Sequence, residues 1–279
     1  MKRYAQGLRR PASAIAVLAA VFGVVLAGCS SGGSNSGSGS AGSGNSGGSG
    51  ASSPASKSSG SGSGSGGATS VTSSSSVPFP IAVGNTWVYE TTEGSAGAIS
   101  SKRTDKIITV TPVSGGQQVT MSSKSDITGV GSTSQSTYIF HNDGSISYPF
   151  NQFSSVSNGQ IKLISGGLFW PPASAIASGQ PYHSTLKIEF TVAGQRKEIT
   201  SHVTVQGAGT ATVTVPAGTY SATIVNMTLA ETVEGIGVST EVKTWLAGGV
   251  GPVKSEVIID EAGTPHVVSG EELISFTKG

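Results

Sequence analysis

The chain has 279 residues, of which 41 are glycine, 11% are charged and 6% are aromatic, and its formal net charge is +1. Without the basic residues of the first 76 positions, 11 basic residues face 15 acidic ones, a formal net charge of −4. This weakly acidic remainder excludes the basic surface of a nucleic-acid-binding protein and gives no attraction to anionic lipid.

Residues 1–28 have the layout of an export signal. Lys2, Arg3, Arg9 and Arg10 are followed by an uncharged stretch, from position 11 to 28, that is rich in Ala, Val, Ile and Leu. The stretch is slightly shorter than the roughly 20 residues that a membrane-spanning helix needs. We therefore expect residues 1–28 to be a cleaved signal peptide.

The segment Leu26-Ala27-Gly28-Cys29 resembles the lipobox of bacterial lipoproteins. The resemblance implies that Cys29 is acylated on sulfur, for example with palmitate, and that the leader is cut just before it. Two or three acyl chains would make the membrane attachment effectively permanent. The alternative, an uncleaved anchor with a buried Cys29, would also tether the protein. Either way the protein stays tethered to a membrane. With acylated Cys29, we expect a lipid-anchored protein of the cell envelope, on the outer side of the cytoplasmic membrane or in an outer membrane.

Residues 29–76 begin with Cys29 and continue as a tract made almost entirely of Ser and Gly. Such a composition buries no apolar surface, so we expect a disordered linker. A Gly-rich coil from Ser30 to Ser76 has a typical end-to-end distance of about 40 Å. Cys29 is the only cysteine, so no disulfide is available to stabilise the folded part.

From position 77 onward, apolar and polar residues alternate with a period of two, which is typical of half-buried strands. Leu186 and Ile188 alternate with Lys187 and Glu189, and the segments 238–246 and 253–260 show the same pattern. Glycine-containing turn signals separate the segments. Residues 77–279 are therefore predicted to form one all-β domain, an antiparallel meander of about ten to twelve strands. The turn signals are Ser114-Gly115-Gly116, Asn142-Asp143-Gly144, Ala193-Gly194-Gln195, Pro216-Ala217-Gly218, Glu234-Gly235-Ile236-Gly237, Gly248-Gly249, Gly251-Pro252 and Glu261-Ala262-Gly263.

The segment from Phe150 to Gly179 departs from the strand pattern. Its Pro171-Pro172 pair excludes a central strand, and residues 173–177 have the composition of one helical turn. We expect this segment to be a long connection that lies across one face or the mouth of the sheet.

Three motifs resemble those of a group of secreted bacterial lipoproteins that has no assigned activity. They are residues 79–89 (FPIAVGNTWVY), 215–220 (VPAGTY) and 244–254 (TWLAGGVGPVK). The resemblance implies a strongly curved antiparallel sheet, an open barrel distantly similar to the lipoprotein carriers of the Lol system. It supplies no catalytic residues.

Catalytic and metal-binding patterns are lacking in the sequence. His141, His183, His202 and His266 are far apart and have no metal-ligand spacing, and His202 falls on the polar side of its strand. Adjacent carboxylates such as Asp260-Glu261 point to opposite faces of a strand. We therefore expect no catalytic residue, no metal and no cofactor, and regard an exported hydrolase as a minor alternative.

Six large aromatic residues are the candidates for lining a ligand site. Trp245 alternates with Glu241 and Lys243, so it is expected opposite the main apolar stripe, on a face that the 150–172 connection could cover. These aromatic residues either fill a second small core or line an apolar cleft suited to an acyl chain. The six candidates are Trp87, Phe150, Phe153, Phe169, Trp170 and Trp245.

The sequence thus predicts a non-enzymatic envelope lipoprotein with the membrane as partner, through acyl chains on Cys29. One hypothesis adds a bound apolar or amphipathic ligand in an open barrel. The other is a structural or interaction lipoprotein that contacts an envelope protein and holds no ligand.

Overall fold

The described residues of the computed structural model are 79–93, 99–127, 130–147, 153–156, 159–167, 170–192, 195–233, 236–261 and 264–279. The predicted signal peptide (1–28), Cys29 and the predicted linker (29–76) lie outside them, so the proposed domain boundaries stay predictions. No helix in the described ranges has the length and apolar character to cross a membrane.

In the described part of the chain, thirteen strands make up one antiparallel sheet, which confirms the predicted all-β fold class. Two of the strands are short pieces of two and four residues. The strands are β1 (Thr86–Glu93), β2 (Ile99–Val113), β3 (Gly116–Ile127), β4 (Val130–His141), β5 (Ile146–Ser147), β6 (Phe153–Val156), β7 (Gly159–Ser165), β8 (Tyr182–Val192), β9 (Gln195–Val215), β10 (Gly218–Val233), β11 (Ile236–Ala247), β12 (Gly251–Glu261) and β13 (Thr264–Thr277).

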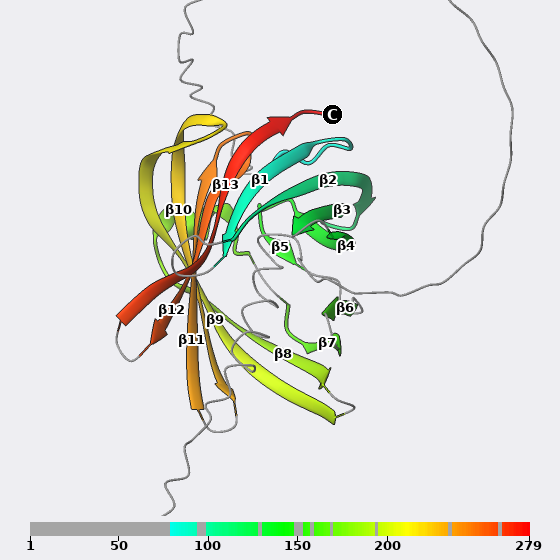
Figure 1. Ribbon diagram of the computed structural model, residues 1–279, viewed down its shortest axis with the longest axis vertical. Coiled ribbons are helices and arrows are strands. Elements are labelled where there is room, and N and C mark those ends of the chain that lie inside the picture. Colours follow the sequence, from blue (N-terminus) through cyan, green and yellow to red (C-terminus); the bar gives the residue numbers. More distant parts are fainter. Residues whose placement is uncertain are drawn as a thin grey trace, which may run out of the picture.

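The order of the strands places the first and last of them side by side in the middle of the sheet. The order is β5-β4-β3-β2-β1-β13-β12-β11-β10-β9-β8-β7-β6, so each strand pairs with its neighbour along the chain except at the β1–β13 pair and at the edges. Figure 1 shows β1 next to β13, with β2 to β4 on one side and β8 to β12 on the other. The sheet is therefore a meander whose ends meet.

The turns follow the glycine signals. Gly115 has φ 77° between β2 and β3, and Gly218 has φ 138° at the start of β10. Both values lie in a region that glycine adopts without steric cost. The Asn142-Asp143-Gly144 turn is also formed, with the Asp143 carboxylate accepting hydrogen bonds from Ser145. The predicted turn residues 193–194, 234–235 and 262–263 lie outside the described residues.

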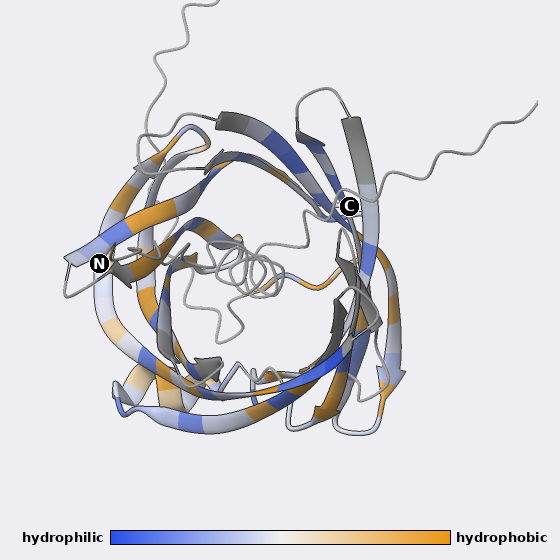
Figure 2. Cartoon of the chain, turned by 60° about the horizontal axis from the view of Figure 1, so that its bottom comes forward, coloured by the Kyte–Doolittle hydropathy of each residue, from blue (hydrophilic) through white to orange (hydrophobic). Residues whose placement is uncertain are grey.

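The sheet is strongly curved and wraps around an interior (Figure 2). Register shifts in six of the strand pairs mark bulges, which increase twist and bend a strand. The tip of the β9–β10 hairpin reaches β13, where the Ala217 amide donates to the Leu273 carbonyl at 2.9 Å. At the edge of the sheet, β5 pairs with β4 on one side, and on its other side Ile146 pairs with Trp170 through two hydrogen bonds of 3.0 and 2.9 Å. The sheet is an open barrel.

The connection predicted for Phe150 to Gly179 is partly wrong. Within it, β6 and β7 extend the edge of the sheet instead of lying across a face. The apolar–polar–apolar alternation of Ile161-Lys162-Leu163 is a short strand signal that explains this pairing. The predicted helical turn is formed as α2 (Ala173–Ser178), which ends at Gly179 in the left-handed conformation, φ 67°.

Two apolar clusters line the inside of the curved sheet. The first joins β8 to β12 with Trp170 and with Ile176 of α2. A Cβ on Gly207 of β9 would overlap the Ile176 carbonyl oxygen, so the glycine permits this close approach. The second core joins β1, β2 and β3 with β13 and with the tips of the β9–β10 and β11–β12 hairpins.

Candidate functional site

The inner face of the sheet consists of two chemically different walls. The apolar wall lies on β8 to β12, where alternate residues are buried, and it comprises Leu186, Ile188, Ile199, Val203, Val205, Val225, Met227, Leu229, Val242, Leu246 and Val257. The alternation predicted for 186–189 is confirmed, because Leu186 and Ile188 are buried while Lys187 and Glu189 are half-buried on the other face. Such a wall favours contact with apolar groups.

The polar band is the second wall of the inner face. It is a set of buried polar residues on β2, β3, β4, β12 and β13. Arg103 and Asp105 share the inner face of β2 with Ile107, which is 1% exposed. Neighbouring strands add hydroxyl groups and one more carboxylate at adjacent register positions. The polar band comprises Ser101, Arg103, Asp105, Ser123, Ser125, Ser136, Ser255 and Glu271.

Arg103 is the centre of the polar band. Its Nε donates to the two carboxylate oxygens of Asp105 at 3.0 and 3.2 Å, and its guanidinium also pairs with Glu271. The guanidinium carbon lies 4.8 Å from the centre of the Tyr89 ring. Thr91 and Ser255 direct hydroxyl groups at Glu271, both at 3.4 Å. Each buried charge in this group therefore has an opposite charge beside it.

Tyr89 lies beneath the guanidinium and stays in its neutral form. Burial raises the pKa of its phenol strongly, the negative charge of Asp105 raises it further, and Arg103 opposes the shift. The hydroxyl donates to the Pro252 carbonyl at 3.0 Å. With that bond the phenol ties β1 to β12 and is not available as a proton donor to a ligand.

Among the described residues, Glu231 is a buried charged residue for which no ion pair is formed. It is 4% exposed at the end of the row Val225, Met227, Leu229 on the inner face of β10. The Ser201 hydroxyl donates to its Oε1, whereas Oε2 has no hydrogen-bond partner among the described residues. Burial raises the pKa of the Glu231 carboxyl, and the bond from Ser201 partly offsets this. A carboxylate of this kind can accept a donor from a ligand.

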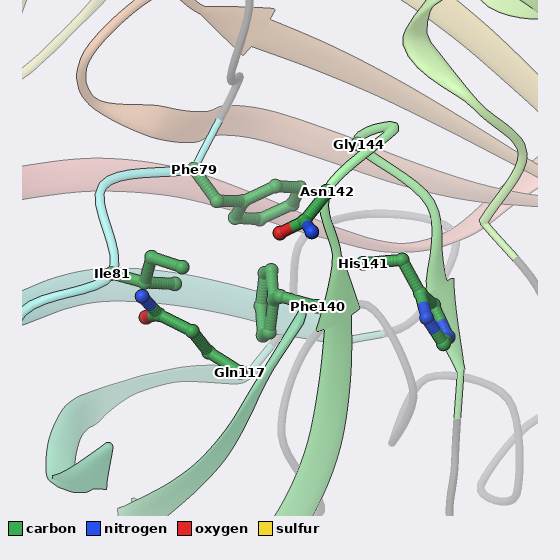
Figure 3. A pocket seen from close by; sticks show the side chains of 7 residues that line it. All are labelled: Phe79, Ile81, Gln117, Phe140, His141, Asn142 and Gly144. Atoms are coloured by element: carbon green, nitrogen blue, oxygen red, sulfur yellow. The ribbon is translucent and has the colours of Figure 1, made fainter. Parts of the chain in front are cut away.

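A small pocket lies at the edge of the sheet, beside the β4–β5 turn (Figure 3). Its volume is about 160 Å³, well below the roughly 300 Å³ at which ligand pockets begin. The centre of the Phe79 ring lies 5.8 Å from the centre of the Phe140 ring and 6.4 Å from that of Trp170. In Figure 3 the His141 ring points away from these rings. The pocket residues are Phe79, Ile81, Gln117, Phe140, His141, Asn142 and Gly144.

Three of the six predicted lining residues have described side chains, and all three pack into or against the cores. Trp87 is 3% exposed, and its ring stacks on Phe276 with 5.1 Å between the ring centres. Its Nε1 donates to the Val250 carbonyl oxygen at 2.6 Å. Trp170 is 4% exposed in the first core, and its indole Nε1 finds no hydrogen-bond partner among the described residues. Phe150 and Phe169 lie outside the described residues, as does the side chain of Phe153. The set of six therefore stays a prediction.

Trp245 faces away from Val242 and Leu246, as its alternation predicts. The described part of the connection packs on the opposite, inner face, because Trp170 and Ile176 join the core of Val242 and Leu246. The half-buried Trp245 ring instead lies under two ammonium groups, those of Lys243 at 5.0 Å and Lys254 at 5.5 Å.

The histidines do not gather at any site. His183, His202 and His266 are exposed, and half-buried His141 bonds to Ser147 through Nε2 at 2.9 Å. Among the described residues, no group of three or more His, Cys, Asp or Glu side chains is placed to hold a metal ion.

The polar band and Glu231 escaped the sequence reasoning, although their signal was present. Arg103 and Asp105 occupy the same alternate positions as buried Ile107, and Glu231 occupies those of Met227 and Leu229. A charged residue in phase with an apolar stripe points to the buried face of its strand. This phase assigns the charged residues of β2 and β10 to the buried face of their strands.

A model of the DUF3108-like family matches residues 83–263, and the chain belongs to this family. The fold is similar to that of a "putative lipoprotein" of Parabacteroides distasonis, with TM-score 0.55, 17% identity, and coverage of 72% of this chain and 98% of the other. A "putative exported protein with YmcC-like fold" of Bacteroides fragilis has TM-score 0.52 and 15% identity over the same shares. No curated protein is significantly similar in sequence.

Proposed function

We propose that this member of the DUF3108-like family is a non-enzymatic lipoprotein of the bacterial cell envelope that binds an amphipathic ligand. Acyl chains on Cys29 attach it to the membrane, and residues 29–76 form a flexible linker to the sheet. The inner face of the open barrel holds the ligand.

The observation that carries this proposal is the division of the inner face into an apolar wall and the polar band. A closed core would gain nothing from burying Arg103, Asp105 and Glu271, because taking paired charges out of water costs about as much as their attraction returns. An amphipathic ligand matches such a surface, since its apolar part lies on β8 to β12 and its polar part meets the buried polar groups of the inner face, Glu231 among them.

The site of entry is the edge of the sheet at β5. Besides the two hydrogen bonds between Ile146 and Trp170, one bond from the Ala173 amide to the Asp143 carbonyl, at 3.2 Å, links the described residues of this edge. Most other neighbouring strands are joined along their whole length. Breaking these few bonds opens the barrel at the least cost.

The proposed anchor is supported by the sequence Leu26-Ala27-Gly28-Cys29. The descriptions of the two similar structures, a lipoprotein and an exported protein, agree with export and anchoring. Replacing Cys29 with Ala should abolish incorporation of a labelled palmitate analogue and leave the full-length precursor unprocessed. Labelled, processed Cys29→Ala protein in the membrane fraction would contradict the anchor.

The ligand is tested with the chain that starts at Ser30, which contains every described residue and lacks the anchor. Exported behind a replacement signal peptide without a lipobox and recovered from the envelope fraction, this chain should carry an extractable amphiphile that mass spectrometry detects. Stripped of it, the chain should bind amphiphiles with long alkyl chains, measured by displacement of a fluorescent probe. If neither co-purified lipid nor probe binding is found, ligand binding is wrong.

A second candidate is an interaction lipoprotein without a ligand. The outer face favours it at one place, where half-buried Trp245 lies between Lys243 and Lys254, because aromatic residues are enriched in interfaces. A photo-crosslinking residue at position 243 in living cells should then capture one defined envelope protein. The same residue at position 102, on another exposed part of the sheet, is the control.

A further inference from the structure

We propose that the ligand of the inner face carries a protonated amine at its polar end, and that Glu231 Oε2 accepts a hydrogen bond from this amine. This inference rests on the proposed function, because it names the class of amphiphile that the open barrel holds. The inference adds the sign of the ligand's charge and the residue that recognises this charge.

The charge of the inner face favours a cation. Among the described residues four charged side chains are buried, and three of them are acidic: Asp105, Glu231 and Glu271 against the single base Arg103. The other basic residues with described side chains are exposed or half-buried. An anionic ligand would therefore meet an excess of like charge, which costs more in a buried site than in water.

The polar band has no charge to spare for a ligand. Arg103 is shared by two carboxylates, Asp105 through Nε and Glu271 through the end of the guanidinium. The hydroxyl groups of Thr91 and Ser255 also approach Glu271. An anionic head group would have to displace one of these carboxylates from Arg103 and leave it buried and unpaired.

Glu231, in contrast, has one oxygen in use and one available. Ser201 on β9 occupies Oε1, and the neighbour on β11 in register with Glu231 is Val238, which cannot donate a hydrogen bond from its side chain. The remaining oxygen is buried and has no hydrogen-bond partner among the residues that the structure describes. Buried polar atoms without partners are uncommon in native proteins, and they destabilise the fold more when the group is charged than when it is neutral.

The surroundings of Glu231 fit the end of an amphiphile rather than a free ion. Leu229 and Met227 precede it on the same face of β10, and Val203 is the register partner of Leu229 on β9. An alkyl chain attached to an amine can therefore follow the apolar wall while the amine stays at Glu231. A metal ion would need several ligands, and the described residues here offer one carboxylate.

The test compares three amphiphiles that differ only in the polar end: dodecylamine, dodecanol and dodecanoate. The chain from Ser30, stripped of lipid, is titrated below the micelle concentrations at about pH 8, where the amine is protonated. Displacement of a neutral fluorescent probe gives the affinities. Native protein should bind the amine about tenfold or more tightly than the alcohol, as expected for a charge-assisted hydrogen bond, and the acid most weakly.

Two variants separate recognition by Glu231 from general attraction to an acidic protein. Glu231→Gln should bring the amine to the affinity of the alcohol and leave the alcohol unchanged. Glu198→Gln removes the same net charge from an exposed position on β9, and it should preserve the preference for the amine. Circular dichroism of both variants verifies that the sheet is formed.

The outcomes distinguish this inference from the proposed function. Equal binding of all three compounds, or a preference for dodecanoate, leaves amphiphile binding standing and overturns the amine site. An amine preference that survives Glu231→Gln also overturns it. Absence of binding by all three compounds overturns both.

Discussion

Arg103 and Glu231 are both buried charged residues on the inner face of one sheet, yet their surroundings differ in every respect. Arg103 has two carboxylates, an aromatic ring and a set of hydroxyl-bearing neighbours around it. Glu231 has one hydroxyl and an apolar wall. The first group is complete without a ligand, whereas the second leaves an oxygen unused.

The difference indicates what each region contributes. A fully paired group connects strands, and Arg103 with its partners joins β2 to β13 across β1, where the two ends of the meander meet. An unpaired carboxylate forms no ion pair between strands, and its burial destabilises the folded state. Its presence in an otherwise apolar wall is therefore better explained by recognition than by stability, and four variants test this contrast.

Arg103→Met should have the largest effect. The substitution leaves Asp105 and Glu271 buried without a counterion, and breaking a buried ion pair in this way costs about 3–5 kcal/mol. Urea unfolding of the chain from Ser30 measures the loss. Lys102→Met, on the exposed face of the same strand, is the matched control and should change little. Similar losses for the two variants would show that the Arg103 group does not hold the β1–β13 junction.

Met227→Ala should come next, through a different mechanism. Met227 is 2% exposed in the middle of the apolar wall, and truncating such a residue costs about 2–5 kcal/mol because a cavity remains. We expect the lower half of this range, since the neighbours of a flexible methionine can partly collapse. Displacement of the fluorescent probe should also weaken. A stability loss with unchanged binding would remove this wall from the site.

Glu231→Gln, in contrast, should raise the free energy of unfolding, by an amount that depends on pH. Because the folded state raises the pKa of this carboxyl, the unfolded chain releases the proton first as the pH rises above about 4.5, the usual value for glutamate. The free energy of unfolding of the native protein therefore falls with pH, by at most about 1.4 kcal/mol per unit. Neither register neighbour, Ser201 or Val238, titrates in this range.

The Gln variant should lack this fall, so its advantage over the native protein should grow from about pH 5 upward. Urea unfolding at a series of pH values measures the difference in the absence of ligand. A difference that stays constant with pH would mean that Glu231 is not held in a desolvated position.

Glu198→Gln should have the smallest effect. The Glu198 carboxylate lies 2.6 Å from the Lys187 ammonium on the outer face, but the two side chains are 51% and 38% exposed. Ion pairs in water contribute about 0–1 kcal/mol, so we expect a change in unfolding free energy below about 0.5 kcal/mol. A larger loss would mean that this exposed ion pair on the outer face contributes substantially to stability, contrary to our expectation.

Much of the fold was predictable from local patterns. The alternation around Leu186 and Ile188 and the turn at Ser114-Gly115 predict strands and hairpins, because period two and positive φ are properties of short segments. The same reasoning missed β7, since Ile161-Lys162-Leu163 is too short to stand out beside the prolines and glycines that follow. It also placed the connection on the Trp245 face, because alternation assigns a face but not what packs on it.

The candidate site was less accessible from the sequence. Arg103, Asp105 and Glu231 could each be assigned to a buried face by their phase with Ile107 and Leu229. Their partners could not, because Glu271 lies 168 positions from Arg103 along the chain and Ser201 lies 30 positions from Glu231. Pairing or isolation of a charge depends on strand order and register, which no local pattern contains.

The sequence by itself thus determined that the chain is an all-β protein built of hairpins, and it carries the prediction of an anchor at Cys29. Alternation and turn chemistry act between neighbours along the chain, so they can be read there. Only the tertiary structure decided that β1 meets β13, that Arg103 is fully paired and that Glu231 is not. Those facts depend on the curvature of the whole sheet, which brings distant strands together around one interior.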